Sequence, residues 1–125
     1  MHPDWPDHLR VLLQGVEVRV RCGLHDWERD PEQPNRLLVD VELWADDAGP
    51  DAPLIDYDRI REGVLAWQAR DHVDLLETLV EDGLALCWSL PRVRAARVRV
   101  VKPDIFPETA AAGVEVFRRR PAIAG

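Results

Sequence analysis

Apolar and polar residues alternate at every second position near the start of the chain. The apolar members of this stretch are Val16, Val18, Val20 and Cys22. A period of two predicts a half-buried β-strand over Leu9–Cys22, in which Gly15 is a candidate bulge. A polar loop with prolines, residues 23–35, leads to a second alternating stretch, Leu37–Trp44. Acidic residues within that stretch indicate a strand with one solvent-facing side, antiparallel to the first.

The hydrophobic period changes to that of helices in the middle of the chain. Residues 46–56 are rich in Asp, Ala, Pro and Gly and predict a loop. Asp56 is placed to cap a helix that begins at Tyr57 and ends near Asp71. A second amphipathic helix is expected over Val73–Ser89, before Pro91. Its apolar stripe consists of Leu76, Leu79, Val80, Leu84 and Cys87.

Two further alternating stretches, Val93–Val101 and Gly113–Arg119, predict the last strands. The segment between them begins with residues 102–107, which two prolines hold extended. The order ββααββ is typical of an α+β protein, with an antiparallel four-stranded sheet and two helices on one of its faces. Such a thin unit leaves sheet edges and part of one face uncovered, so self-association is expected.

Composition and charge narrow the function classes. The chain has 125 residues, of which 46% are hydrophobic and 31% charged, so we expect one globular domain over residues 1–125. A net charge of −7 argues against a nucleic-acid partner, and the short basic run 118–120 is expected to be a solvated strand end. No apolar run approaches the roughly 18 residues of a membrane span, and the opening residues do not resemble a signal peptide. A cytoplasmic location is therefore expected.

The cysteines and histidines do not form a pattern for metal binding. Cys22 and Cys87 lie far apart, without a CxxC motif or a Cys/His cluster, so no metal or cofactor is expected. Cys87 falls inside a helical pattern and is interpreted as a small buried hydrophobe. His25 has no second ligand near it in the sequence.

A few polar residues could carry chemistry, although each also has an ordinary interpretation. Lys102 ends an apolar strand, where a lysine is usually solvated but, if desolvated, can act as an acid–base or Schiff-base group. Glu28 lies in a loop, where a carboxylate is normally exposed. Tyr57 starts a helix and more often packs than reacts. Glu77 lies near a helix N-terminus, where a carboxylate ordinarily interacts with the helix dipole.

Several short segments of the chain, taken in order, resemble one protein family. The first is Gly-Leu-His-Asp-Trp-Glu at 23–28, and a Lys-Pro pair at 102–103 ends a later strand. The remaining matching segments are 38–43, 55–57, 74–79, 98–101 and 113–116. Each motif alone is weakly specific, but the ordered set over about residues 9–120 resembles the bacterial dihydroneopterin aldolases.

The resemblance implies a fold, an assembly and a reaction. The fold would be the tunnelling fold, in which four subunits close their sheets into a barrel, giving a homo-tetramer or a homo-octamer of two rings. Active sites would lie at subunit interfaces. The reaction would be the metal-free cleavage of 7,8-dihydroneopterin, a small-molecule pterin, into 6-hydroxymethyl-7,8-dihydropterin and glycolaldehyde in folate biosynthesis.

The resemblance also implies roles for individual residues. Lys102 would be the general acid–base, Tyr57 its partner in proton transfer, and Glu28, contributed by a neighbouring subunit, would orient Lys102 or the substrate. Glu77 would anchor the pterin by accepting two parallel hydrogen bonds from its ring. The other substrate-binding residues implied are Leu76, Asp56 and Ile55.

Three loops depart from the family pattern, namely 29–36, 48–53 and 104–112, and alternatives stay open. One is an epimerase acting on dihydroneopterin or its triphosphate. A triphosphate needs extra cations at the mouth of the pocket, where the sequence offers Arg29, Arg36 and Lys102. Another is a pterin-binding paralogue without catalysis. The presence of all four site positions, Glu28, Tyr57, Glu77 and Lys102, argues against this alternative. Zinc-dependent enzymes of the same fold, such as cyclohydrolases and pyruvoyl-pterin synthases, would need a ligand pattern that this sequence lacks.

Overall fold

The computed structural model describes residues 6–122, so the opening five residues on which the expectation about a signal peptide partly rests lie outside it. In chain order its elements are β1 (His8–Val20), the 3-10 turn η1 (Asp26–Glu28), β2 (Asn35–Asp46), α1 (Tyr57–Leu65), the 3-10 turn η2 (Ala66–Ala69), α2 (Leu76–Trp88), β3 (Ala95–Lys102) and β4 (Ala112–Arg119). The strands form one antiparallel sheet in the order β1-β2-β3-β4. The predicted ββααββ order and α+β class are confirmed.

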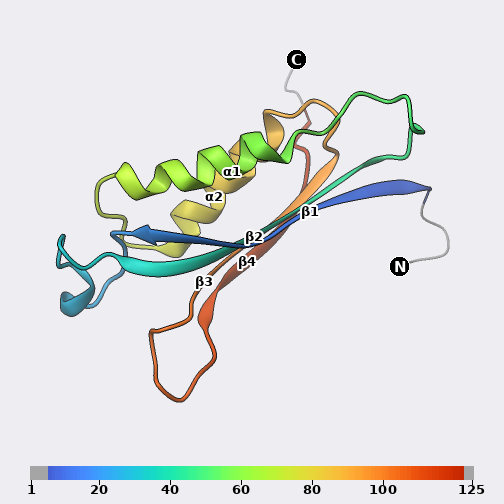
Figure 1. Ribbon diagram of the computed structural model, residues 1–125. Coiled ribbons are helices and arrows are strands. Elements are labelled where there is room, and N and C mark those ends of the chain that lie inside the picture. Colours follow the sequence, from blue (N-terminus) through green and yellow to red (C-terminus); the bar gives the residue numbers. More distant parts are fainter. Residues whose placement is uncertain (1–5, 123–125) are drawn as a thin grey trace.

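The molecule has two layers, with α1 and α2 lying side by side on one face of the sheet (Figure 1). The core fills the space between the layers, because the inward side chains of the strands are apolar at every second position. Its fully buried members include Val18, Val39 and Val98 from the sheet, and Ile60, Val64, Leu79 and Leu84 from the helices. Cys87 is also fully buried, as predicted.

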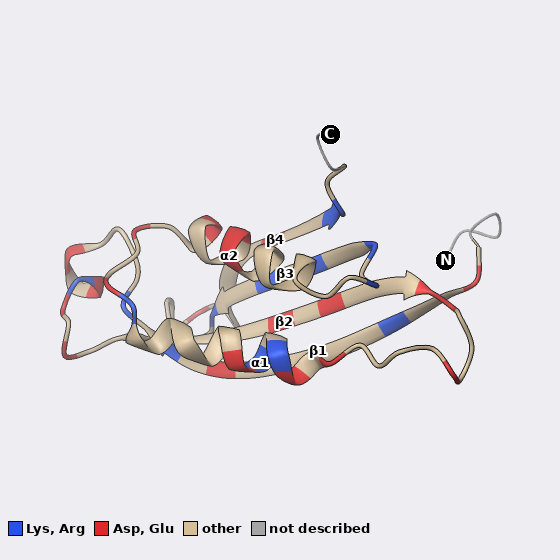
Figure 2. Ribbon diagram, turned by 90° about the horizontal axis from the view of Figure 1, so that it is seen from above, with Lys and Arg blue, Asp and Glu red and all other residues tan. Residues whose placement is uncertain are grey.

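Acidic positions along β2 lie beside basic positions along β3 (Figure 2), because Asp40 is paired with Arg99 and Glu42 with Arg97 in the strand register. Glu42 of β2 pairs with Arg97 of β3 and lies 3.7 Å from Arg10 of β1. Arg97 in turn lies 3.7 Å from Glu115 of β4. Ion pairs therefore link all four strands on one face of the sheet, on which Arg10 and Glu115 are exposed, as expected for a solvent-facing side, whereas the central Glu42 is buried.

Gly15 interrupts β1 as a bulge, which confirms the prediction. Its φ of +67° lies in the region that favours glycine, and the β1–β2 register shifts between Leu13 and Val16. The Gly15 N–H donates a hydrogen bond to Asp40 Oδ1 at 2.6 Å. The extra residue allows Leu13 and Val16, three positions apart, both to pack against the core.

The helix boundaries were predicted less well. Asp56 does cap α1, since its side chain accepts a hydrogen bond from the Asp58 N–H at 3.0 Å. The predicted start of the second helix at Val73 is wrong, because α2 begins at Leu76. Val73 instead pairs with Cys22 in a short parallel bridge, with its N–H donating to Arg21 O at 2.8 Å.

The basic run at 118–120, expected to be a solvated strand end, is solvated only in part: Arg119 is exposed, whereas Arg118 and Arg120 are half-buried. Arg118 makes two hydrogen bonds to Glu81, at 2.7 and 2.9 Å. Arg120 donates to the main-chain oxygens of Trp88, Leu90 and Val93, and so satisfies carbonyls at the end of α2. Within residues 6–122, no helix is long and apolar enough to cross a membrane.

Candidate active site

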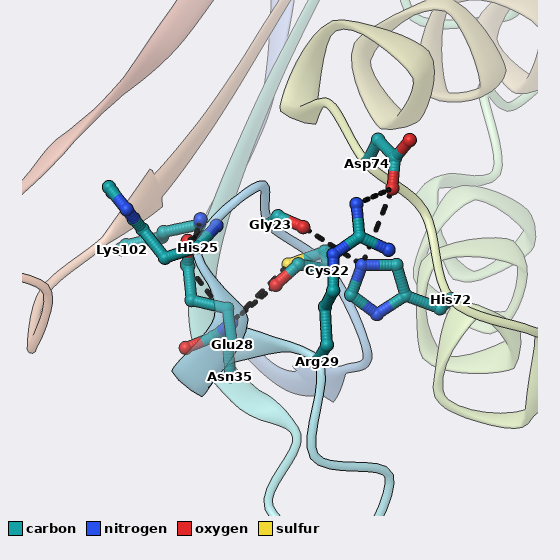
Figure 3. A network of polar contacts seen from close by, with 9 residues as sticks. All are labelled: Cys22, Gly23, His25, Glu28, Arg29, Asn35, His72, Asp74 and Lys102. Atoms are coloured by element: carbon teal, nitrogen blue, oxygen red, sulfur yellow. Dashed lines mark hydrogen bonds and ion pairs between the residues drawn. The ribbon is translucent and has the colours of Figure 1, made fainter.

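A lysine–glutamate pair lies where β3 ends beside the loop that follows β1. Lys102 is the last residue of β3, and its side chain is 12% exposed. Glu28 ends the 3-10 turn η1, and its side chain is 1% exposed. The Lys102 Nζ donates a hydrogen bond to Glu28 Oε2 (Figure 3). The expectation of an exposed loop glutamate is therefore wrong.

Glu28 is buried because Gly23 leaves room for it. A Cβ atom at residue 23 would lie 2.3 Å from Glu28 Cδ, and Gly23 has a φ of +125°, which disfavours any other residue. The chain then turns through η1, so that the His25 N–H donates to Glu28 Oε1 at 3.3 Å. A carboxylate in this position is surrounded by donors although it lies in a loop.

Asn35, the first residue of β2, lies on the other side of Glu28. Its Nδ2 donates to Glu28 Oε2 at 3.3 Å and to Cys22 O at 2.5 Å. Cys22 itself is fully buried, and burial raises the pKa of its thiol, while the positive charge of Lys102 acts in the opposite direction. The thiol beside the pair is therefore protonated at neutral pH.

Polar contacts tie this loop to the segment that precedes α2 (Figure 3). His72 Nε2 lies 2.9 Å from Gly23 O, and Arg29 donates to Asp74 Oδ1 at 3.0 Å. The Gly23 N–H also donates to the main-chain oxygen of Val73 at 2.9 Å. The first turn of α2, which carries Leu76 and the exposed Glu77, follows directly. The structure therefore brings Glu28, Lys102 and the start of α2 to the same end of the sheet.

The other predicted residues lie at the opposite end of the chain's sheet. α1 starts after the loop that leaves the end of β2, and Arg92 binds that loop through Pro53 O and Asp46 O (Figure 1). Tyr57, at the start of α1, is 49% exposed. Asp56 caps the helix, and Ile55 is a buried member of the core. Within one chain, Ile55, Asp56 and Tyr57 are therefore separate from Lys102.

One expectation is corrected by this geometry. Glu28 was expected to reach Lys102 from a neighbouring subunit, but the two side chains are paired within one chain. The reason is the reversal of the chain between Gly23 and Asn35, which folds the loop back onto the end of β3. Among residues 6–122, no three His, Cys, Asp or Glu side chains gather in a way that could hold a metal ion.

Comparison with known proteins identifies the family of this chain. The family model for dihydroneopterin aldolase matches residues 11–117, which include both members of the Lys102–Glu28 pair. The chain belongs to the dihydroneopterin aldolase family. The family resemblance and the tunnelling-fold class inferred from the sequence are thereby confirmed.

Individual dihydroneopterin aldolases agree with this assignment. The chain is 34% identical over 100 residues to a dihydroneopterin aldolase of Streptomyces coelicolor, covering 76% of this chain and 82% of that protein. It is 32% identical to a dihydroneopterin aldolase of Burkholderia thailendensis solved bound to guanine, with a TM-score of 0.77 and coverage of 96% and 98%. The E. coli dihydroneopterin aldolase solved with neopterin is 23% identical over 87% of this chain and 97% of its own, with a TM-score of 0.75, and supports the fold.

Two residues of this candidate site are not predicted from the sequence. From the sequence, Asn35 is the last residue of a polar loop, and His72 precedes the second helix without a distinguishing pattern. Only the position of Asn35 could have indicated its role. It directly precedes an alternating stretch, so the strand holds its main chain in place and its side-chain amide can contact a neighbouring loop. His72 gave no such signal, because the main-chain oxygen that its ring contacts at 2.9 Å belongs to Gly23, 49 positions away.

Proposed function

We propose that this chain is an aldolase that cleaves 7,8-dihydroneopterin into 6-hydroxymethyl-7,8-dihydropterin and glycolaldehyde. The observation that carries the proposal is the buried Lys102–Glu28 pair in a chain of this family. A lysine held by a carboxylate beside a loop is suited to moving protons at a substrate that docks there. The family match supports the pterin as the substrate class.

In the proposed reaction, the pterin ring lies against the start of α2. Glu77 accepts two hydrogen bonds from the 2-amino group and the ring N3–H. Guanine, which is bound in the Burkholderia relative, presents the same pair of donors on its six-membered ring. Leu76 packs beside the ring, and Glu77 is free to point outward because it is exposed.

Bond cleavage then needs one proton removed and one delivered. A base removes the proton of the 2′-hydroxyl, the C1′–C2′ bond breaks, and glycolaldehyde leaves. The electron pair passes through C1′ and C6 toward N5, giving an enamine that is protonated at C1′ to form the hydroxymethyl product. Lys102 moves these protons, and Glu28 keeps its Nζ in place. The dihydropterin itself accepts the electron pair, so Lys102 needs no Schiff base.

The proposed enzyme is a homo-tetramer or homo-octamer in which a neighbour completes each site. Tyr57 lies at one end of the chain and Lys102 at the other, so a shared site supplies Tyr57, with Asp56 and the main chain of Ile55, from the adjacent subunit. The edges of β1 and β4 have no strand partner in the described part of one chain, which favours pairing between copies. In this proposal Tyr57 and Lys102 come from different subunits, whereas Glu28 and Lys102 come from the same one.

The charges around the site favour a substrate without phosphate groups. Arg29 is held by Asp74 at 3.0 Å, and Lys102 by Glu28. Arg36 is held by Glu17 and, at 3.3 Å, by Asp104. The three cations considered for a triphosphate are thus neutralised by carboxylates. Aldolase action on unphosphorylated dihydroneopterin is therefore favoured over action on the triphosphate.

The proposed location is the cytoplasm. Cys22 and Cys87 are both free and buried, as is usual for thiols in a reducing compartment. The proposed partners are the pterin and further copies of the chain.

Two experiments test the proposal. Purified protein is incubated with 7,8-dihydroneopterin and, separately, with its triphosphate, and the products are separated by chromatography. We expect 6-hydroxymethyl-7,8-dihydropterin from 7,8-dihydroneopterin and not from the triphosphate. An epimer without cleavage products, or turnover of the triphosphate only, would contradict the aldolase assignment.

The second experiment tests the shared site by mixing variants whose own activity is strongly reduced. Lys102→Ala and Tyr57→Ala chains, refolded together in equal amounts, should regain about a quarter of wild-type activity, because random assembly pairs an intact Lys102 with an intact Tyr57 in that share of sites. Lys102→Ala mixed with Glu28→Ala should regain none, because both changes affect residues contributed by one chain. Equal recovery in both mixtures would refute the proposed division of the site.

A further inference from the structure

We propose that Asn35 is a positioning residue for this reaction: its side-chain amide fixes the Glu28 carboxylate so that Oε2 faces Lys102. The inference rests on the proposed aldolase function but concerns a residue outside the four site positions inferred from the sequence. It begins from the two hydrogen bonds that the Asn35 amide donates.

The Asn35 amide is anchored before it reaches the carboxylate. Its Nδ2 donates to Cys22 O at 2.5 Å, and Cys22 is itself fixed, since it is fully buried and pairs with Val73. The same nitrogen lies 3.3 Å from Glu28 Oε2. One donor group therefore connects Cys22, in the segment that follows β1, to the carboxylate.

The two oxygens of Glu28 have different surroundings as a result. Oε1 accepts the main-chain N–H of His25 at 3.3 Å, whereas Oε2 accepts from both Asn35 and Lys102. The carboxylate also packs against Gly23, so closely that residue 23 has no space for a side chain. Rotation about the last side-chain torsion of a glutamate is otherwise soft, so these contacts determine which oxygen faces the lysine.

This orientation matters for proton transfer more than for substrate binding. Lys102 has a flexible stem, and its Nζ reaches a reproducible position only if its partner oxygen is fixed. A small misplacement of an acid–base group lowers the rate of the chemical step. The pterin ring is held at the start of α2, on a different element, so its affinity should depend little on Asn35.

The test compares variants of Asn35 in the intact protein. Asn35→Ala should lower kcat by about 10- to 100-fold, the range expected when a positioned acid–base group is displaced, and change KM for dihydroneopterin by less than about threefold. Asn35→Gln keeps the donor and should recover most of kcat, whereas Asn35→Asp, of the same shape without the donor, should not. Gln33→Ala, an exposed side chain of the same loop, is the matched control and should leave both constants unchanged.

A double-mutant cycle separates positioning from a general structural role. If Asn35 acts through Glu28, adding Asn35→Ala to Glu28→Ala should lower kcat by less than about twofold further. The same fold-loss in both backgrounds would overturn the proposal, as would a rise in KM with kcat unchanged. If Asn35→Ala does not fold, the same cycle is run with Asn35→Asp and Asn35→Gln.

Failure of the proposed function would look different. Wild-type protein without aldolase turnover would refute the function, and the crystal structure of Asn35→Asp would then test the positioning alone. A Glu28 carboxylate rotated away from Lys102 supports the inference, and an unchanged carboxylate overturns it.

Discussion

Lys102 and Glu28, 74 positions apart in the sequence, meet in a buried contact in which the Lys102 Nζ donates to Glu28 Oε2. Their side chains are 12% and 1% exposed. Removing one member of such a pair leaves the other charge without its partner, whereas removing both does not. The pair is therefore expected to affect both turnover and stability.

Lys102→Ala should reduce aldolase turnover by about 10²- to 10⁴-fold, the usual effect of removing a positioned acid–base group. It should also lower the free energy of unfolding by about 3 kcal/mol, because Glu28 stays buried without its cation. Urea unfolding gives the second value, and the Lys102→Ala, Glu28→Gln double variant should recover part of it. Near-wild-type turnover of Lys102→Ala would show that the lysine does not transfer the proton.

Lys102 should not form a Schiff base with the substrate, because the dihydropterin itself accepts the electron pair. Borohydride treatment of the wild-type protein with substrate should therefore give no mass increase on the Lys102 peptide.

Glu77→Ala should chiefly weaken pterin binding. Loss of a charged acceptor for two ring donors costs about 2–4 kcal/mol, which is some tens- to hundreds-fold in affinity. Because Glu77 is exposed, the melting temperature should hardly change. Titration calorimetry with a pterin product measures the affinity. Glu81→Ala, one turn later on the same helix, is the control, and equal affinity in the Glu77 and Glu81 variants would refute the anchor.

Gly23→Ala should abolish most of the activity by displacing Glu28. A Cβ at this position would lie 2.3 Å from Glu28 Cδ, and the φ of +125° adds backbone strain. Gly49→Ala is a matched control, since Gly49 also has a positive φ, +85°, but nothing within 4 Å of the added atom. Both variants should lose about 1–2 kcal/mol of stability from the backbone. Turnover assays should show a large loss in Gly23→Ala alone; similar activities of the two variants would contradict the account of the Glu28 site.

Stability should fall at alkaline pH because of a buried thiol. Burial raises the pKa of Cys87 from 9.0 to about 12, so above pH 9 the unfolded chain releases a proton that the folded chain keeps. The unfolded state then binds fewer protons, and the free energy of unfolding decreases with pH, by up to about 1.4 kcal/mol per unit. Urea titrations at pH 8, 9 and 10 measure the slope. Cys87→Ala should be less stable at pH 8 but show a shallower slope, and an equal slope in both proteins would exclude Cys87 as the cause.

The sheet could be predicted from the sequence because its pattern is local. Val16, Val18 and Val20 alternate with charged residues, and only one face of a strand with this pattern can be buried. The start of α2 could not be predicted in the same way. Val73 carries an apolar side chain that suits a helix, but its N–H bonds to Arg21 O, far away in the sequence, and this contact holds it extended.

The family motifs, and the position of Lys102 at the end of a strand, indicated the chemistry of the site, but nothing in the sequence indicated the surroundings of Glu28. Burial of that carboxylate depends on the space beside Gly23 and on Asn35, which meet it only after the loop has folded back. Nothing in the amino-acid sequence decides which chain supplies each residue. The structure pairs Glu28 with Lys102 and separates Tyr57 from them, opposite to what was expected for Glu28.

The bulge at Gly15 has a consequence for solubility. It lies in β1, an edge strand, where it interrupts the regular spacing of main-chain hydrogen-bonding groups. A straight, uninterrupted edge accepts almost any extended peptide and is a common starting point for amyloid-like stacking. Any strand that adds to the edge of β1 must accommodate the kink at one fixed place. In a chain that has not paired this edge with another copy, the bulge thus disfavours indiscriminate aggregation, and a variant with a regular β1 should form fibrils more readily under mildly denaturing conditions.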